Sequence, residues 1–328
     1  MTTVELLKLL RDMSSFAAIW LSTWLLLFGC LYLVYPHLRK KLAAWHPATA
    51  ANAVLGLIAL PFCTSLLATS LLFGGLLELN VITLHHHSAD CEGKFPRLES
   101  YWTVAAVLGL SALALTTMAG KFVRHLLAAR ELRKHLMSLG ERRRDWCLLP
   151  NDEKLVFTLG WVSNDIFITE GMLRECSERD LAIILEHERA HAARRDNLRI
   201  LTARLMLLAV PTRFARPLLD DLHLYIEAAC DFATAAKHGA LNVAETLLRI
   251  LRLVPENFDF RNPALVSAFT GSEVESRILL LVDADNKTQL EPYRFWPFLL
   301  MLLFFSVALV DPMHHAAELL LGSIQAAF

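Results

Sequence analysis

The stretch SERDLAIILEHERAHAARR, residues 177–195, predicts a single well-defined helix. Ser177 and Asp180 have the spacing of a capping box, so the helix should open at about Glu178 and run to about Arg195. Its apolar residues recur at helical spacing, which indicates that one face is buried against a core: Leu181, Ile184 and Leu185.

The same helix carries the pattern H-E-x-x-H between His187 and His191. Residues four apart lie on one face of a helix, so both imidazoles can reach a single Zn²⁺. Glu188 is offset by one residue, and its carboxylate can therefore reach the water that a catalytic zinc activates. The pattern predicts that His187 and His191 are metal ligands and that Glu188 is the catalytic general base. The alternative is a helix whose histidines only contact carboxylates.

Catalytic zinc usually has three protein ligands and one open position, so a third ligand is expected on a later helix. The sequence predicts such a helix over about residues 217–239, with Glu227 and Asp231 on one face. We expect Glu227 to bind the metal and Asp231 to orient a ligand histidine; a carboxylate pair on a solvated face is the alternative. Asp196 is expected to orient an arginine or the second helix, or to be a surface acid at a helix end.

The residues around these helices predict a compact unit with little strand. KLVFTL at 154–159 and IFIT at 166–169 have strand character, and the turn residues 163–165 between them predict a hairpin. Residues 121–139 predict a helix rich in basic residues. The apolar run 198–210 is too short to span a membrane, so a core or membrane-surface helix is expected there.

The composition indicates a membrane protein. Hydrophobic residues make up 55% of the 328 residues and charged residues only 20%, which exceeds the apolar content of an ordinary soluble domain. The 32 Lys and Arg nearly cancel the 33 Asp and Glu, so direct binding of nucleic acid is not expected. Six cysteines are too few for a disulfide framework.

The apolar residues cluster in four runs: residues 14–35, 48–77, 100–120 and 295–310. The first three are long enough to span a bilayer, and the fourth is long enough if residues 293–294 lie at the interface. The distribution of Lys and Arg around the runs predicts that both termini are external. We therefore expect three transmembrane helices in residues 1–121, a cytoplasmic domain in 122–292, and a fourth span with a short external tail in 293–328.

A family resemblance emerges from these motifs. ILEHERAHAARRDNL at 184–198, with EAACD at 227–231 downstream, resembles the gluzincin-type membrane metallopeptidases and is most similar to the BlaR/MecR-like antirepressor proteases. Residues 157–160, 168–172 and 276–278 are similar to the same family. The HtpX-like and prenyl-CaaX-protease-like families share H-E-x-x-H and a later Glu-x-x-x-Asp.

The resemblance implies a mainly α fold. It implies a polytopic protein with four transmembrane helices and an inserted cytoplasmic gluzincin-like zinc protease domain with a small β-hairpin or sheet. The protein is then expected in a bacterial cytoplasmic membrane, in contact with lipid, with Zn²⁺ as its cofactor and its active site facing the cytoplasm.

The resemblance also implies a role: signal-regulated, site-specific cleavage of a cytoplasmic protein or peptide, such as a transcriptional repressor. An HtpX-like quality-control protease and a non-catalytic, metal-stabilised membrane receptor are the alternatives. The sequence contains no S-x-x-K followed by K-T-G, and only residues 311–328 follow the fourth predicted span. Acylation by a β-lactam is therefore not expected, and a different signal or an external sensor partner is.

Two further groups of residues are candidates for function. His85–His87 with Asp90 and Cys91, and His314–His315, lie in predicted external segments and could bind a transition metal, although a chance run of histidines is the alternative. Four residues are candidates for stabilising an oxyanion, with a structural role as the alternative for each: His223, Tyr225, His238 and Arg277.

Overall fold

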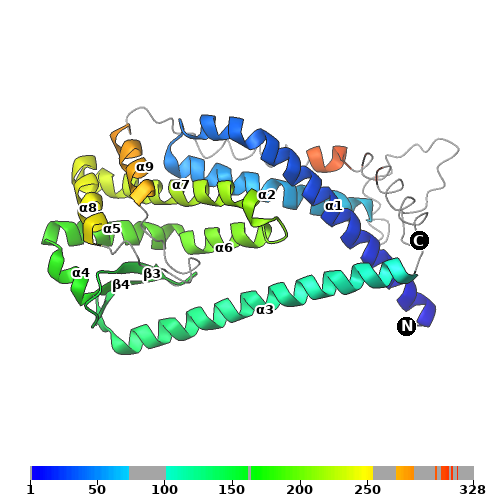
Figure 1. Ribbon diagram of the computed structural model, residues 1–328, viewed down its shortest axis with the longest axis horizontal. Coiled ribbons are helices and arrows are strands. Elements are labelled where there is room, and N and C mark those ends of the chain that lie inside the picture. Colours follow the sequence, from blue (N-terminus) through cyan, green and yellow to red (C-terminus); the bar gives the residue numbers. More distant parts are fainter. Residues whose placement is uncertain are drawn as a thin grey trace. The chain divides into compact units, whose positions relative to one another are not determined.

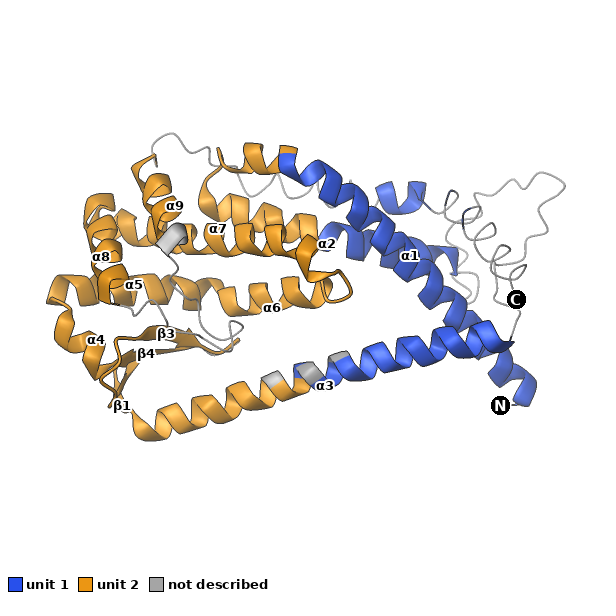
Figure 2. Ribbon diagram, viewed as in Figure 1, with its two compact units in different colours: residues 1–36, 59–122, 291–328 blue, residues 37–58, 123–290 orange. Residues whose placement is uncertain are grey.

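The computed structural model describes residues 2–73, 101–161, 164–253 and 271–283, together with residues 300, 304–309, 312 and 316. These residues are mostly helical and include one small mixed sheet. The chain divides into two compact units (Figure 2). The first comprises residues 1–36, 59–122 and 291–328. The second comprises residues 37–58 and 123–290.

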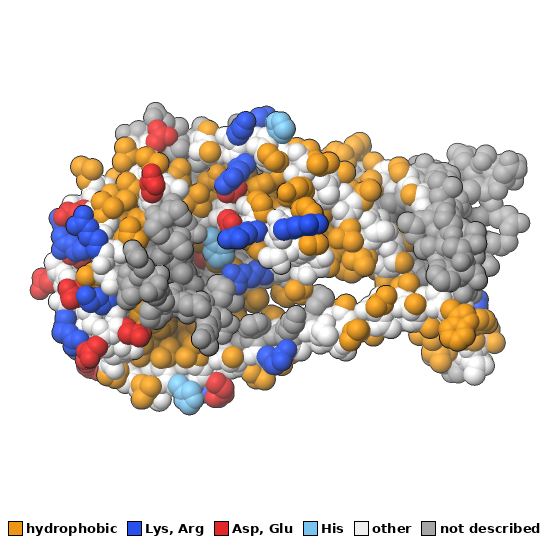
Figure 3. All heavy atoms as spheres, in the orientation of Figure 1, with side chains coloured by type: hydrophobic (Ala, Val, Ile, Leu, Met, Phe, Trp, Pro, Cys, Tyr) orange, Lys and Arg blue, Asp and Glu red, His pale blue; other side chains and the backbone are white. Residues whose placement is uncertain are grey.

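Among the described residues, three helices are long and apolar enough to cross a membrane. They are α1 (Thr3–Leu42), α2 (Pro47–Leu72) and α3 (Tyr101–Leu139). They coincide with the first three predicted spans, whereas most of the predicted fourth span lies outside the described residues. In Figure 3, hydrophobic side chains dominate the surface of the first unit and charged side chains gather on the second. The prediction of a membrane protein therefore agrees with the helices described.

A four-stranded sheet lies in the second unit. Its strands are β1 (Glu141–Arg143), β2 (Trp146–Leu149), β3 (Val156–Leu159) and β4 (Asp165–Thr169), in the order β1-β2-β4-β3. The antiparallel β3–β4 hairpin confirms the sequence prediction. The sequence did not predict β2, which runs parallel to β4, or β1, which is antiparallel to β2. Among the described strands, β3 is therefore an edge of the sheet.

The end of α3 is set by Gly140, as predicted. A Cβ on Gly140 would lie 2.3 Å from Sγ of Cys147, so only glycine lets the chain enter β1 so close to β2. Behind this turn, one face of the sheet and the end of α3 form a hydrophobic core with buried Ala129, Leu159 and Phe167. This core joins the last turns of α3 to the sheet.

Six helices complete the second unit (Figure 1). They are α4 (Glu170–Glu175), α5 (Glu178–Arg194), α6 (Asp196–Met206), α7 (Thr212–His238), α8 (Ala240–Leu253) and α9 (Gly271–Val282). α5 has the predicted bounds and the predicted capping box of Ser177 and Asp180. α7 ends before Gly239 as predicted, but it begins five residues earlier than Pro217, because Pro211 already provides the break that precedes the helix.

The helix α5 lies at the centre of the second unit. One side of it packs on the sheet, where Ile184 contacts a cluster that includes Ile168 of β4. Another side packs on α8 and α9, where Ile183 shares a cluster with Val243 and Val274. A helix held on several sides is a rigid support for the polar residues that it carries.

The turn between α1 and α2 also belongs to the second unit, although the sequence analysis placed it with the membrane helices only. Nε and a terminal nitrogen of Arg39 donate to Oδ1 of Asp221 at 3.1 and 2.7 Å. The ring of His46 lies edge-on to Phe232, with 5.1 Å between the ring centroids. The end of α1 and the turn that follows it therefore contact α7 directly.

Candidate metal centre

Three predicted metal ligands meet between α5 and α7. Nε2 of His187 and Nε2 of His191 lie 3.1 Å apart. Oε2 of Glu227 lies 3.4 Å from Nε2 of His187, and its Oε1 lies 3.4 Å from Nε2 of His191. All three side chains are buried. The helical spacing of the two histidines and the facing carboxylate of α7 therefore bring the predicted donor atoms to one point.

These separations fit a tetrahedral zinc ion. Ligand atoms about 2.0–2.1 Å from a tetrahedral Zn²⁺ lie about 3.3–3.4 Å from one another. The three measured separations, 3.1, 3.4 and 3.4 Å, lie close to that value. Two neutral imidazoles and one carboxylate are also the donor set of catalytic zinc, which leaves a fourth position open for water or substrate. The residues present thus fit Zn²⁺.

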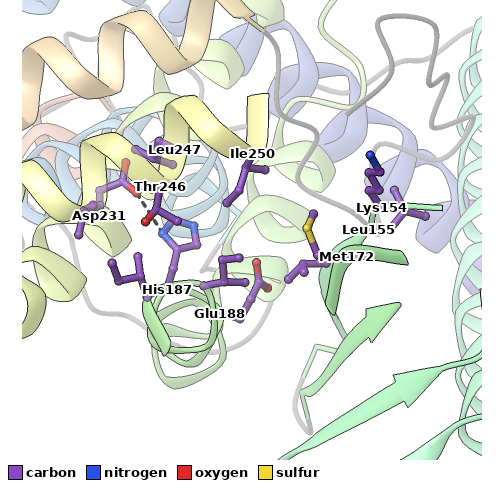
Figure 4. Close-up of a pocket in the computed structure, with 13 residues that line it drawn as sticks. Lys154, Leu155, Met172, His187, Glu188, Asp231, Thr246, Leu247 and Ile250 are labelled. Carbon is purple, nitrogen blue, oxygen red and sulfur yellow. Dashed lines mark ion pairs between the residues drawn. The ribbon is translucent and has the colours of Figure 1, made fainter. Parts of the chain in front are cut away.

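His187 is oriented through its second ring nitrogen. Nδ1 of His187 lies 3.0 Å from Oδ1 of Asp231 (Figure 4). Asp231 is completely buried and accepts two hydrogen bonds from Arg277 of α9, at 2.6 and 2.7 Å. The third guanidinium nitrogen of Arg277 lies 3.2 Å from Oε2 of Glu227. Asp231 therefore has the predicted position beside a ligand histidine, and Arg277 joins it to the third ligand.

His191 is oriented in a similar way by Asp196. Nδ1 of His191 lies 3.0 Å from Oδ2 of Asp196, which begins α6. Arg195 joins α5 to α6 in the left-handed conformation, with φ 54° and ψ 44°, and this break returns Asp196 to the imidazole. Asp196 also pairs with Arg194 and Arg199, as the sequence suggested for an arginine partner. The contact with His191 was not predicted.

The charges of the site favour a cation at its centre. Burial is the largest influence on Glu227, but the charges of His191 and Arg277 outweigh it and hold the pKa of Glu227 well below its usual range. Burial likewise disfavours a charged His187, yet its hydrogen bonds to Asp231 and Glu227 raise its pKa. The carboxylates of Glu227 and Asp231 are therefore ionised, and they stabilise positive charge at the position between the imidazoles.

Glu188 contacts the sheet beside the three ligands. The hydroxyl of Thr158 on β3 donates to Oε2 of Glu188 at 2.5 Å. Thr158, Glu188 and the three ligand residues line one pocket, together with Asn197 and Ile200 of α6. The carboxylate of Glu188 is thus close to the metal position without contributing to the ligand set.

The other candidate residues lie at different places. Arg277, a candidate for the oxyanion, instead uses its three nitrogens on Asp231 and Glu227. Tyr225 is buried, and its burial and the nearby Asp221 raise its pKa to about 12. His238 ends α7, three turns beyond Glu227, whereas His223 lies one turn before Glu227. The oxyanion role of these residues stays a prediction, and residues 85–91 and 314–315 lie outside the described residues.

Two site residues were missed by the sequence reasoning. Cys230 is fully buried between Glu227 and Asp231, with Sγ 3.4 Å from Oδ2 of Asp196. Asn197 follows Asp196 and donates to two main-chain carbonyls at the end of β3. Neither residue type has a spacing rule that would have selected it.

The helices and donor set define a metallopeptidase class of site. Residues 152–249 match the model of peptidase family M48. The matched segment runs from four residues before β3 into α8 and includes His187, Glu188, His191 and Glu227. The match supports a metallopeptidase site of the M48 type in this segment and is equally compatible with BlaR/MecR-like and HtpX-like proteins. No curated protein and no solved structure matches the chain.

Proposed function

We propose that the chain is a zinc endopeptidase that cuts a cytoplasmic protein, such as a transcriptional repressor, at a defined site in response to a signal. The observation that carries the proposal is the position of Glu188, which lines the same pocket as the three converging donor residues and contacts Thr158 of an edge strand. A metal site that only stabilises a fold has no need of such a carboxylate, so this position argues against a non-catalytic receptor.

The residues of the site divide the chemistry between them. A Zn²⁺ ion held by His187, His191 and Glu227 would polarise the scissile carbonyl and acidify the attacking water. Glu188 accepts the proton of that water and passes it to the leaving amine. The hydroxyl of Thr158 holds the carboxylate of Glu188 toward the pocket.

The substrate is expected to lie along β3. An extended peptide can add to the edge of a sheet through main-chain hydrogen bonds, with side-chain pockets providing specificity. A second, mainly apolar pocket opens beside His187, between β3 and α8, and Leu155, Leu247 and Ile250 are part of its lining (Figure 4). An apolar side chain next to the cleaved bond would fill it.

Regulation by a signal is supported by the turn between α1 and α2. Arg39 at this turn pairs with Asp221, six residues before Glu227 on the same helix. Arg199, which pairs with Asp196, also donates to Asn52 of α2. A movement of the first two helices can therefore reach residues that orient the zinc ligands, although coupling requires a demonstrated two-state element.

The proposal is tested with Glu188→Gln in the purified full-length protein. This variant should keep about one equivalent of zinc, since Glu188 is not a ligand, and lose at least about 100-fold in activity because the general base is removed. Glu186→Gln, two residues earlier on α5, is the matched control and should retain activity, because Glu186 pairs with Lys237 outside the site. Equal cleavage by the Glu188→Gln and wild-type proteins would sink the endopeptidase assignment.

The role is tested in cells by comparing new N-terminal peptides between wild type and Glu188→Gln. One or a few defined cleavage sites in cytoplasmic proteins would support the regulated role. The HtpX-like alternative predicts many unrelated fragments of membrane proteins instead.

A further inference from the structure

We propose that Asn197 closes one end of the β3 edge and thereby confines the substrate strand to one side of the cleaved bond. The inference rests on the proposed endopeptidase function and adds a specificity-determining residue to it. It follows from the direction of the main-chain groups of β3, the hydrogen bonds of Asn197 and the position of Glu188.

The main-chain groups of β3 alternate between its neighbour and its open edge. The carbonyl of Leu155 accepts a hydrogen bond from the N–H of Thr169, next to β4. In an antiparallel pair the direction alternates with each residue, so the groups of Leu155, Phe157 and Leu159 face β4. Those of residues 154, 156, 158 and 160 therefore face the open edge.

Asn197 covers the far end of this edge. Its Nδ2 donates to the carbonyl of Thr158 at 3.1 Å and to the carbonyl of Gly160 at 3.0 Å. Gly160 has φ 125°, a conformation open to glycine, and the bend lets both carbonyls converge on one amide. Both N–H groups of the Asn197 amide therefore donate to carbonyls that would otherwise accept hydrogen bonds from an added strand.

The other end of the edge is available to a substrate. In the described part of the chain, no hydrogen bond from another element covers the main-chain groups of Lys154 and Val156. The apolar pocket opens on this same side, because Lys154, Leu155 and Val156 are in its lining. Glu188, which marks the reacting bond, contacts Thr158 at the boundary between the two ends.

A substrate is therefore held unequally on the two sides of the cleaved bond. Toward Lys154 it can pair with β3 over about two residues and place a side chain in the apolar pocket. Toward Gly160 the carbonyls of Thr158 and Gly160 are already bound to Asn197, so the substrate must leave the edge within about one residue. The cleaved bond should accordingly lie at the end of an extended segment of the substrate.

The test uses the full-length protein and denatured casein as its probe. The shortest casein peptide that is cleaved at one bond is lengthened and shortened by single residues at either end. On one side of the bond, each of about two residues should change kcat/KM about fivefold, as expected for a strand hydrogen bond. On the other side, residues beyond the first should change kcat/KM by about twofold or less.

Asn197→Ala should then change the pattern on the insensitive side. Freed carbonyls of Thr158 and Gly160 can accept from a longer substrate, so the ratio of kcat/KM for long and short peptides should rise about fivefold on that side. Asn164→Ala is the matched control. Nδ2 of Asn164, which lies just before β4, donates to the carbonyl of Ala192 at 2.9 Å and does not contact the β3 edge. This variant should keep the wild-type length pattern.

Two results would overturn the inference: equal length dependence on both sides in the wild type, or an unchanged length ratio in Asn197→Ala. The wild-type measurement decides the matter even if the variant fails to fold. If cleavage of the casein peptide persists unchanged in Glu188→Gln, the endopeptidase function fails, and the inference falls with it.

Discussion

The two candidate ligand histidines are oriented by the same contact but supported in different ways. In each, Nδ1 lies 3.0 Å from an aspartate oxygen. Behind His187, Asp231 is paired with Arg277, which is 2% exposed and comes from a distant helix. Behind His191, Asp196 is paired with Arg199, whose side chain is 15% exposed and contacts Asn52. The support behind His187 is buried in the core, whereas the support behind His191 extends to α2.

This difference predicts which of the two aspartate–arginine pairs contributes more to the stability of the fold. A buried carboxylate that loses its only buried cation is costly, because water cannot replace the partner. A carboxylate whose arginines reach solvent loses less, because water and the second arginine compensate. We therefore expect mutations behind His187 to affect folding and mutations behind His191 to affect mainly the metal.

The largest effect is expected for Arg277→Leu. This change leaves Asp231 and Glu227 buried without their cation and should destabilise the protein by about 3–5 kcal/mol. For a domain of this size the melting temperature of the detergent-solubilised protein should fall by about 10 °C. Arg252→Leu, at an exposed position of α8, is the control and should cost no more than about 0.5 kcal/mol. A melting temperature equal to that of the control would show that the core does not depend on this pair.

An intermediate effect is expected when each aspartate is replaced separately. Asp231→Asn and Asp196→Asn should each weaken zinc binding by about 10–100-fold, since each removes the charged partner of a ligand imidazole. Titration with a competing chelator measures this loss. Only Asp231→Asn should also lower the melting temperature markedly, because it leaves Arg277 with a weaker buried partner. Equal losses of stability in the two variants would break the comparison.

The smallest effect is expected for Asn52→Ala. It removes a hydrogen bond between an exposed asparagine and Arg199. The free energy of unfolding should therefore fall by about 1 kcal/mol or less, and zinc affinity should fall by about twofold. Asn52→Asp sharpens the test, because a new carboxylate would compete with Asp196 for Arg199. If Asn52→Ala weakened zinc binding as strongly as Asp196→Asn, the turn would control the metal directly.

The parts of the site that the sequence predicted are those set by local geometry. His187, His191 and Glu188 follow from the 3.6-residue period of one helix, and the capping box of Ser177 fixes where that helix begins. The third ligand Glu227 was selected by its spacing to Asp231 on a second helix. Periodicity and capping are short-range, so they can be read without knowledge of the fold.

The parts that were missed depend on residues far apart in the chain. Arg277 lies 46 positions from Asp231, and no pattern links a lone arginine to a buried aspartate at that distance. The pairing of β2 with β4 joins strands that are separated in the sequence by β3. The short run of β2 shows no alternation of polar and apolar residues that would predict a strand. Asn197 acts through main-chain carbonyls, which carry no sequence signal at all.

The left-handed residue Arg195 between α5 and α6 constrains the number of residues between His191 and Asp196 more than it constrains their identity. A continuous helix turns about 100° per residue, so the fifth position after His191 would face about 140° away from the imidazole. An inserted or deleted residue between His191 and Asp196 would rotate the carboxylate off its partner. Glycine at position 195 should be tolerated well, because it adopts this conformation without a Cβ penalty. The segment from His191 to Asp196 should therefore not tolerate insertions or deletions, whereas the side chain of Arg195 can be replaced.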